Sequence, residues 1–427
     1  MLKIYKRGET PDAELIRREA GAANVTDTVA AIIADVRQNG DAALLAYNAR
    51  FDRAEGVALE VTAEELDAAC MRVDPELVKV IELAAENIRA FHSKQLSHGY
   101  IMSGKNGSLL GQRVIPLRRV GLYIPGGTAA YPSSVLMNCI PAKIAGVDEI
   151  VMTTPASGGA VSDVILAAAK IAGVDRVFRV GGAQAVAALA YGTETVPQVD
   201  KIVGPGNAFV AEAKRQVFGQ VAIDMIAGPS EILVVSDGKS DPKWIAADLL
   251  SQAEHDKLAT AILITDSMPL AEAVQAEVER QLAVLPREEI ARAAIEANGK
   301  IIVTGTLDEA VEMANAVAPE HLELAVDSPF DFLPKVRNAG SIFLGRYCPE
   351  PLGDYLSGTN HTLPTMGTAR FSSPLGVEDF VKRSYFSYYT ADALEQVADA
   401  AALFADAEGL HGHAVSATAR RNGGEGK

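Results

Sequence analysis

Apolar positions in the first hundred residues follow the spacing of amphipathic helices. They recur at intervals of three and four over 12–19, 26–37 and 75–91, as one buried helix face requires. The sequence Thr62-Ala-Glu-Glu65 has the form of a capping box, so a further helix should begin there. Asn106-Gly107 lies between short apolar stretches and predicts a β-hairpin.

From residue 120 the pattern changes to short apolar runs that helix-like stretches separate. Near-continuous apolar runs of this kind are typical of parallel strands covered by helices on both faces. Eight runs fit two sheets better than one, with a break near 227–230. The runs are 120–124, 149–152, 176–180, 201–203, 231–235, 259–264, 300–303 and 341–344.

Strand-like runs stop after about residue 375. The pattern there predicts helices over 391–405 and 408–420, and a disordered end over 421–427. The expected fold class is α/β, with two Rossmann-like parallel-sheet domains and helical extensions at both termini. The sequence contains no GxGxxG, so the standard dinucleotide fingerprint is absent.

Composition narrows the class of protein. A chain of 427 residues is too long for one small core, and 48% apolar with 22% charged residues is ordinary for a soluble globular protein. The net charge of -16, from 39 basic and 55 acidic residues, argues against nucleic acid or an anionic membrane as the main partner.

Cysteine usage and the N-terminus suggest a location. The three cysteines are scattered and show no CxxC spacing, which favours a reducing compartment. The start of the chain has no apolar signal region, and no run of about 18 apolar residues occurs. We therefore expect a soluble cytoplasmic protein.

Four polar residues form a candidate metal set. Asp241-Pro242 predicts the start of a helix through about residue 256, on which Gln252 and His255 share a face. Asp354 is expected in a loop beside a glycine, and His413 in the last predicted helix. Each residue alone fits an exposed helix end, a turn or the surface. Together, two imidazoles, a carboxylate and an amide suit zinc or another borderline divalent ion, although glutamine is an uncommon zinc ligand.

Glu320 and His321 form a candidate acid/base pair. Histidine suits removal of a proton from an alcohol, and a carboxylate suits activation of water. Both follow Pro319, which fixes the local backbone. On an extended segment the two side chains would point apart, whereas a bend would let both line one pocket. A helix-to-strand connection with incidental charges is an equally weighted alternative.

Three glycine loops follow strands of the first predicted sheet. They are 123–127, 181–184 and 204–207, and the last leads directly into a predicted helix over 208–217. Backbone amides at such turns can hold phosphate oxygens, and ligands of open α/β sheets bind at these strand ends. A nucleotide is therefore plausible, although for any single loop the glycines could simply end a strand.

These motifs together resemble the histidinol dehydrogenase family over nearly the whole chain. The resemblance rests on many matches in the same order. The matching stretches are 120–127, 181–185, 204–207, 212–216, 223–225, 227–231, 251–255, 319–321 and 353–361.

The resemblance implies a reaction and roles for residues. The family oxidises L-histidinol to L-histidine through the aldehyde, with two NAD and one zinc ion. His321 would be the base for the alcohol, and Glu320 would activate water. The implied metal ligands are Gln252, His255, Asp354 and His413. The other implied contacts are Ser230, His361 and Glu408 with substrate, and Tyr123, Gln184 and Asn207 with NAD.

The resemblance also implies a division into domains and a partner. Residues 1–20 would be an N-terminal extension, 21–118 with 230–375 a discontinuous metal and substrate domain, and 119–229 the NAD-binding domain. Residues 376–427 would form a helical extension that contacts the second subunit of a homodimer. That subunit would receive the C-terminal histidine ligand. His411 competes with His413 for this role, and the spacing from Glu408 favours His413.

Alternatives remain at the sequence level. A related dehydrogenase could act on another primary alcohol, such as a sulfonated diol, because pocket residues outside the shared motifs decide the substrate. A metal-dependent hydrolase could use the same acid/base pair with a purely structural glycine sheet. A non-catalytic binding protein is disfavoured, because every functional position that the resemblance implies is filled.

Overall fold

A computed structural model describes residues 2–18, 25–126 and 130–421. Contacts between Cα atoms group the chain into two compact units. The first comprises residues up to 95 together with 117–380, and the second comprises 96–116 together with the residues from 381 onward. The expected disorder at 421–427 falls almost wholly outside the described residues. Among the described residues, no helix is both long and apolar enough to cross a membrane.

A six-stranded parallel sheet forms one part of the first unit. Its strand order is β1-β11-β10-β9-β12-β13. The bounds are β1 (Lys3–Lys6), β9 (Glu231–Ser236), β10 (Thr260–Thr265), β11 (Lys300–Val303), β12 (His321–Ala325) and β13 (Ser341–Leu344).

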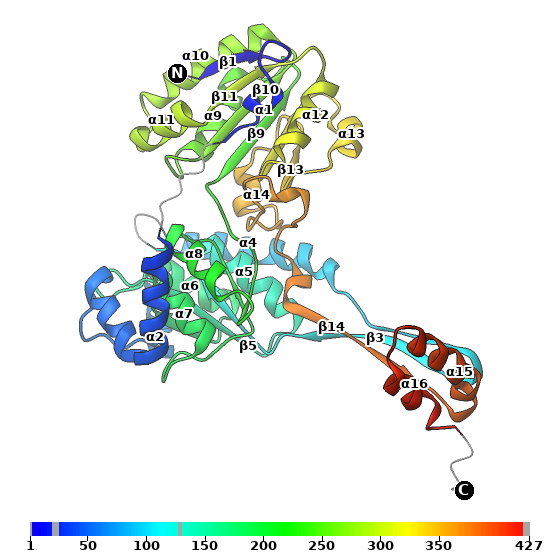
Figure 1. The fold of residues 1–427 in the computed structure, drawn as a ribbon. Coiled ribbons are helices and arrows are strands. Elements are labelled where there is room, and N and C mark those ends of the chain that lie inside the picture. The colour runs from blue at the N-terminus through cyan, green and yellow to red at the C-terminus, as the bar shows by residue number, and fades with distance from the viewer. Residues whose placement is uncertain (1, 19–24, 127–129, 422–427) are drawn as a thin grey trace, which may run out of the picture. The chain divides into compact units, whose positions relative to one another are not determined.

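Helices cover both faces of this sheet, as its apolar strands predict. On β9, Ile232 and Val234 pack with one set of helices, whereas Leu233 and Val235 pack with the other. The first set is α9 (Pro242–Ala253), α10 (Met268–Leu282) and α11 (Glu288–Ala297), and the second includes α1 (Asp12–Leu15) and α12 (Leu307–Val317) (Figure 1). Two shorter helices, α13 (Pro329–Phe332) and α14 (Pro351–Tyr355), flank β13 in sequence.

A five-stranded parallel sheet forms the other part of the first unit, in the order β6-β5-β4-β7-β8. From β4 the chain adds β5 and β6 on one side, and β7 and β8 on the other. The carboxyl ends of β4 and β7 are therefore a topological switch point, where open α/β sheets bind ligands. The bounds are β4 (Arg119–Tyr123), β5 (Glu149–Thr154), β6 (Arg176–Arg179), β7 (Lys201–Val203) and β8 (Ala222–Ile223).

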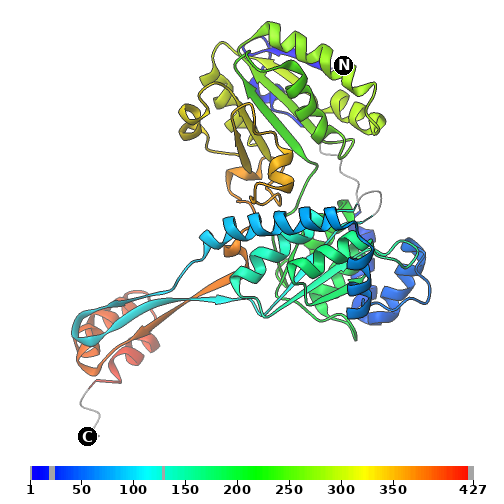
Figure 2. The ribbon, with the colours of Figure 1, turned by 180° about the vertical axis from the view of Figure 1, so that it is seen from behind.

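Two helical layers accompany this sheet. A core cluster joins α2 (Thr26–Tyr47), α7 (Gly182–Tyr191) and α8 (Ala208–Val217) to the strands. Helices α4 (Pro75–His92), α5 (Pro132–Ala145) and α6 (Asp163–Ala172) pack with one another, and α3 (Ala63–Arg72) packs on α6. Helices α4 and α5 lie on the face seen in Figure 2. The Thr62 capping box of α3 is confirmed.

A buried ion pair holds the turn after β7 through hydrogen bonds to its backbone. Gly204 has a φ of +118°, and a Cβ there would collide with the carbonyl oxygen of Tyr123. Asp224 accepts a hydrogen bond from Gly204 N at 2.8 Å, and Lys214 Nζ donates to Gly204 O at 3.0 Å. Lys214 and Asp224 also pair with each other, and both are buried. Glycine is therefore required at residue 204, and the pair fixes where the loop 204–207 points.

The second unit is built on an antiparallel sheet in the order β14-β3-β2. Its bounds are β2 (Tyr100–Ser103), β3 (Leu109–Pro116) and β14 (Val381–Tyr388), and helices α15 (Ala391–Ala407) and α16 (His411–Thr418) follow. The predicted hairpin at Asn106-Gly107 is confirmed, with positive φ at both residues.

Several local predictions differ from the structure. β14 contradicts the expectation of no strand after 375; its residues are mostly exposed, so no buried apolar run marks it. The last predicted helix, 408–420, begins only at His411, because Gly409 has a φ of +76°. All eight predicted strands exist, but β1, β12 and the two-residue β8 were missed.

The structure also groups segments differently from the sequence. Helix α2, expected with the metal and substrate segment, packs on α7 and α8 of the five-stranded sheet instead. The first residues, expected as an extension, form β1 at the edge of the six-stranded sheet. An apolar helix face shows that a partner exists but does not identify it, which explains the difference at α2.

Candidate active site

Most of the candidate site residues line one cavity of about 590 Å³ in the first unit. The residues come from the loop 205–208, the start of β9, the end of α9, the start of β12 and the segment 354–366. Those singled out from the sequence are Asn207, Ser230, Gln252, His255, Glu320, His321, Asp354 and His361.

His321 is a buried base with a defined tautomer. It is the first residue of β12, and its Nδ1 lies 2.9 Å from the carbonyl oxygen of Glu231. A carbonyl only accepts, so Nδ1 carries the hydrogen and Nε2 keeps its lone pair. Nε2 is buried and has no hydrogen-bond partner. Burial lowers the pKa of His321 to about 3, so the ring is neutral at ordinary pH and its Nε2 is unprotonated.

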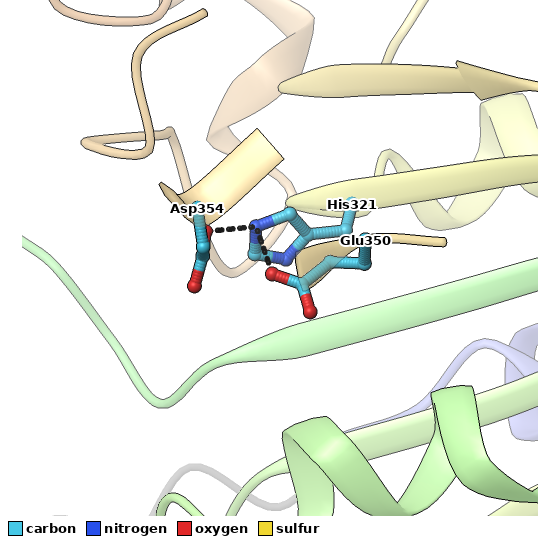
Figure 3. A group of neighbouring side chains, drawn as sticks. All are labelled: His321, Glu350 and Asp354. Carbon is cyan, nitrogen blue, oxygen red and sulfur yellow. Dashed lines mark ion pairs between the residues drawn. The ribbon is translucent and has the colours of Figure 1, made fainter. Parts of the chain in front are cut away.

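Two carboxyl groups face that lone pair (Figure 3). Nε2 of His321 lies 3.6 Å from Oε1 of Glu350 and 3.9 Å from Oδ1 of Asp354. The sequence did not single out Glu350; its only signal was a place four residues before Asp354. Asp354 lies in α14, not in a loop as expected.

The two carboxyl groups also disturb each other. Burial, with a contribution from the charge of Asp354, raises the pKa of Glu350 to about 9. Burial raises the pKa of Asp354 to about 6. Both pKa values rise because burial disfavours the ionised carboxylate when no positive charge offsets it.

Glu320 lies beside His321 because the backbone bends there. Its Oε2 accepts a hydrogen bond of 2.9 Å from Glu231 N, and it lies 3.7 Å from Nδ1 of His321. The peptide groups of Glu231 thus bind both neighbouring side chains, one through N–H and one through C=O. Burial raises the pKa of Glu320 well above 4.5. The structure therefore contains the bend, which brings both side chains to one cavity.

The carboxyl end of α9 brings two further ligating groups to the cavity. Asp241 caps the helix as predicted, but the helix ends at Ala253, so His255 follows it. Both polar atoms of the Gln252 amide are buried and lack a hydrogen-bond partner. The carboxyl end of a helix favours a cation through its dipole.

His361 lies on the other side of Asp354. Its Nδ1 is 3.9 Å from Oδ1 of Asp354, and its Nε2 is 3.4 Å from Oγ of Ser134. Burial lowers the pKa of His361 to about 4, so this ring is also neutral. Asp354 is thus flanked by two neutral imidazoles, His321 and His361.

Two of the four remaining candidates lie in the second unit. His413 is in α16, Glu408 caps the end of α15, and both are exposed. Neither lines the cavity. Nδ1 of His411 lies 2.9 Å from Oδ1 of Asp406, so the competing histidine has an acidic partner within its own unit.

The chemistry of the cavity fits a divalent cation. His321, Glu350 and Asp354 each offer a ligand atom within 4.8 Å of the others. Buried polar atoms of Gln252, His321 and Glu350 lack hydrogen-bond partners, which native interiors rarely tolerate. A cation would satisfy the amide oxygen and offset the carboxylates, and mixed nitrogen and oxygen donors suit a borderline metal such as zinc.

A second, larger cavity of about 970 Å³ lies at the carboxyl ends of the five-stranded sheet. Tyr123, Gln184 and Asn207 line it, as expected for the three glycine loops. The hydroxyl of Tyr123 accepts a hydrogen bond of 3.2 Å from Gly182 N, and Asn207 Oδ1 caps α8. Pro125 and Asn207 line both cavities, so the two adjoin.

Comparisons with known proteins agree with one another. The family model described as histidinol dehydrogenase matches residues 15–421. Histidinol dehydrogenase from Geobacter metallireducens is 56% identical over 414 residues, covering 96% of this chain and 95% of that one. The crystal structure of histidinol dehydrogenase from Elizabethkingia anophelis has a TM-score of 0.94 at 37% identity and covers 98% of each chain.

The buried carboxyl of Glu350 predicts a pH-dependent stability for the metal-free chain. Its folded pKa of about 9 exceeds the ordinary 4.5, so the folded state binds the extra proton between these values. Stability should therefore fall as pH rises through this window. In chelator-treated protein, Glu350→Gln should reduce the loss of melting temperature between pH 6 and 9 by several degrees.

The matched control is Glu289→Gln, since Glu289 is exposed and its pKa is lowered. It should leave the alkaline loss unchanged. If Glu350→Gln behaves like this control, Glu350 is not the source of the loss.

Proposed function

The chain belongs to the histidinol dehydrogenase family, and from that premise we propose that it oxidises L-histidinol to L-histidine through the aldehyde, using NAD and zinc. One observation carries the chemistry: His321 presents a neutral, unpartnered Nε2 to a buried cluster suited to a cation. The adjoining 970 Å³ cavity is large enough for a dinucleotide.

In the first oxidation His321 removes the hydroxyl proton of the substrate. Its Nε2 is free to accept because Nδ1 is committed to the carbonyl of Glu231. NAD, when bound, would accept the hydride from the carbon that carries this hydroxyl. The low polarity around the buried ring keeps the base neutral until that moment.

In the second oxidation Glu320 activates the water that attacks the aldehyde. Its carboxyl lies beside His321, so both bases address the same carbon in turn. A raised pKa brings the titration of a carboxyl toward the pH at which it must accept a proton. Retaining the aldehyde in a buried cavity protects it from side reactions.

We assign Gln252, His255 and Asp354 as metal ligands from this chain. When bound, zinc supplies a fixed anchor for the imidazole and amine of histidinol, which orients the carbinol. Ser230 and His361 line the same cavity and serve as substrate contacts. Tyr123, Gln184 and Asn207 serve as NAD contacts in the larger cavity.

The fourth ligand, His413, and the substrate contact Glu408 come from a second copy of the chain in this proposal. Both residues are exposed in the second unit. That unit also exposes large apolar side chains, among them Tyr385 at 79%, Leu403 at 75% and Phe404 at 71%. Exposed apolar surface of this kind is typical of a subunit interface. A cytoplasmic location completes the proposal, consistent with three unpaired cysteines.

The direct test is turnover. Zinc-loaded protein with L-histidinol and NAD should produce two NADH per substrate, followed by absorbance. A sulfonated diol serves as the comparison substrate and should give much slower turnover. A chain that reduces NAD only with the diol, or not at all, does not have the proposed function.

The two bases should separate the half-reactions. His321→Asn should slow oxidation of the alcohol by about 100-fold or more, the usual contribution of a general base. Glu320→Gln should slow oxidation of the aldehyde more than that of the alcohol. Steady-state rates with histidinol and with the aldehyde measure this, and equal losses in both half-reactions for both variants would contradict the division.

Shared sites predict complementation between inactive subunits. His255→Ala and His413→Ala should each lack activity alone, because each loses a metal ligand. Mixed dimers would contain one site with neither change and should recover up to about half the activity of a wild-type dimer. Mixing after mild dissociation tests this; Lys257→Ala, an exposed change beside His255, is the control. No recovery in mixed dimers would assign all ligands to one chain.

A further inference from the structure

One acidic residue of the larger cavity has no role in the scheme above. Asp52 is the last residue of a five-residue π-helix, η1 (Asn48–Asp52), that directly follows α2. Short π-helical turns inside or beside α-helices are frequent at functional sites. The next residue, Arg53, has a left-handed φ of 55° and ends the turn.

This turn is held by the end of β6 and by the loop after β5. Asn48 Nδ2 donates to the carbonyl oxygen of Arg179 at 2.6 Å. Gly158 N donates to the carbonyl oxygen of Asp52 at 2.7 Å. Asp52 is therefore held beside the loops that follow β5 and β6, at the carboxyl end of the sheet.

Within the part of the chain that the structure describes, the side chain of Asp52 has no hydrogen-bond or ion-pair partner. It lines the 970 Å³ cavity, and its Oδ2 is buried without a hydrogen bond. Burial raises its pKa, which accords with a carboxyl that lacks a cation. A buried acceptor left unsatisfied is costly, so a ligand that donates hydrogen bonds would be stabilised here.

The charges of the described cavity lining narrow the ligand group. Its two charged residues are Asp52 and Arg50. Arg50 is exposed, with its guanidinium 5.0 Å from the centre of the Phe51 ring. A carboxylate repels phosphate and accepts from hydroxyl groups, and the two neighbouring hydroxyls of a ribose match its two oxygens. Backbone amides at the start of α7 remain for the pyrophosphate.

Asp52 stands in for an acidic residue that Rossmann domains have after their second strand and that this sheet lacks. In Rossmann domains an acid that follows the second strand accepts from the adenosine ribose. Here the second strand, β5, ends at the buried Thr154 and continues into Pro155, and both line the same cavity as Asp52. An acid from η1, before the first strand, thus reaches this end of the sheet by another route.

Resting on the proposed use of NAD, we propose that Asp52 binds the adenosine ribose hydroxyls and selects NAD over NADP. Asp52 lines the larger cavity but not the one that contains His321, which assigns it to the adenosine end rather than the nicotinamide end. The 2′-phosphate of NADP would remove one donor and place negative charge against a desolvated carboxylate.

The test is binding of nucleotides to metal-free protein, measured by calorimetry and so independent of turnover. Wild type should bind 5′-AMP and NAD more tightly than adenosine 2′,5′-bisphosphate and NADP. Asp52→Asn should weaken NAD by about 10-fold or more, as expected for a hydrogen bond to a charged group. Asp52→Asn should weaken the binding of NADP less, so the preference for NAD over NADP should become smaller. Asp52→Glu, which keeps the charge, should still discriminate against NADP.

The matched control is Glu55→Gln, which removes an exposed charge that does not line the cavity. It should bind all four nucleotides as wild type does. An Asp52→Asn protein with a wild-type melting temperature and an unchanged preference for NAD overturns the role of Asp52. If that protein still makes NADH from histidinol, the proposed function stands. If the wild-type protein reduces no NAD, the proposed function itself is wrong.

Discussion

The site depends on the peptide groups of one residue, Glu231, where β9 begins. Its N–H binds the carboxyl of Glu320, and its C=O fixes the hydrogen on Nδ1 of His321. Adjacent residues on a strand would point to opposite faces, but these contacts turn both into one cavity. The side chain of Glu231 pairs with Arg18, so the segment before α2 helps to hold this strand end. The tautomer of the base, and hence its direction of proton transfer, follows from this backbone.

Three buried carboxyl groups gather around His321, and among the described residues no ion pair with a lysine or arginine balances them. Glu320, Glu350 and Asp354 all have raised pKa values, and burial is the first cause each time. Such an arrangement is unstable by itself, and a bound divalent ion is its natural complement. The same argument applies to Asp52, whose buried carboxyl oxygen would be satisfied by hydroxyl groups that donate hydrogen bonds. In both cavities the unsatisfied groups are therefore specific to one kind of ligand.

Much of this was predictable from sequence, because buried parallel strands and helix caps leave local signals. All eight predicted strands, the Thr62 capping box and the Asn106-Gly107 hairpin are present. The missed elements lack such signals: β12 begins with a buried histidine and includes Glu323, and β14 is largely exposed. Glu350 was missed because its neighbours in space, His321 and Asp354, are set by tertiary packing and not by spacing.

The pairing of β1 has a consequence for how the chain folds. Residues 3–6 are synthesised before the other strands of their sheet, all of which lie beyond residue 230, yet they hydrogen-bond to residues 300–303. Pairing across so long a separation carries a large loop-closure entropy and is intrinsically slow. The five-stranded sheet can be complete on the ribosome while residues 3–6 are still unpaired. Closure of that sheet edge is thus a late event of biosynthesis.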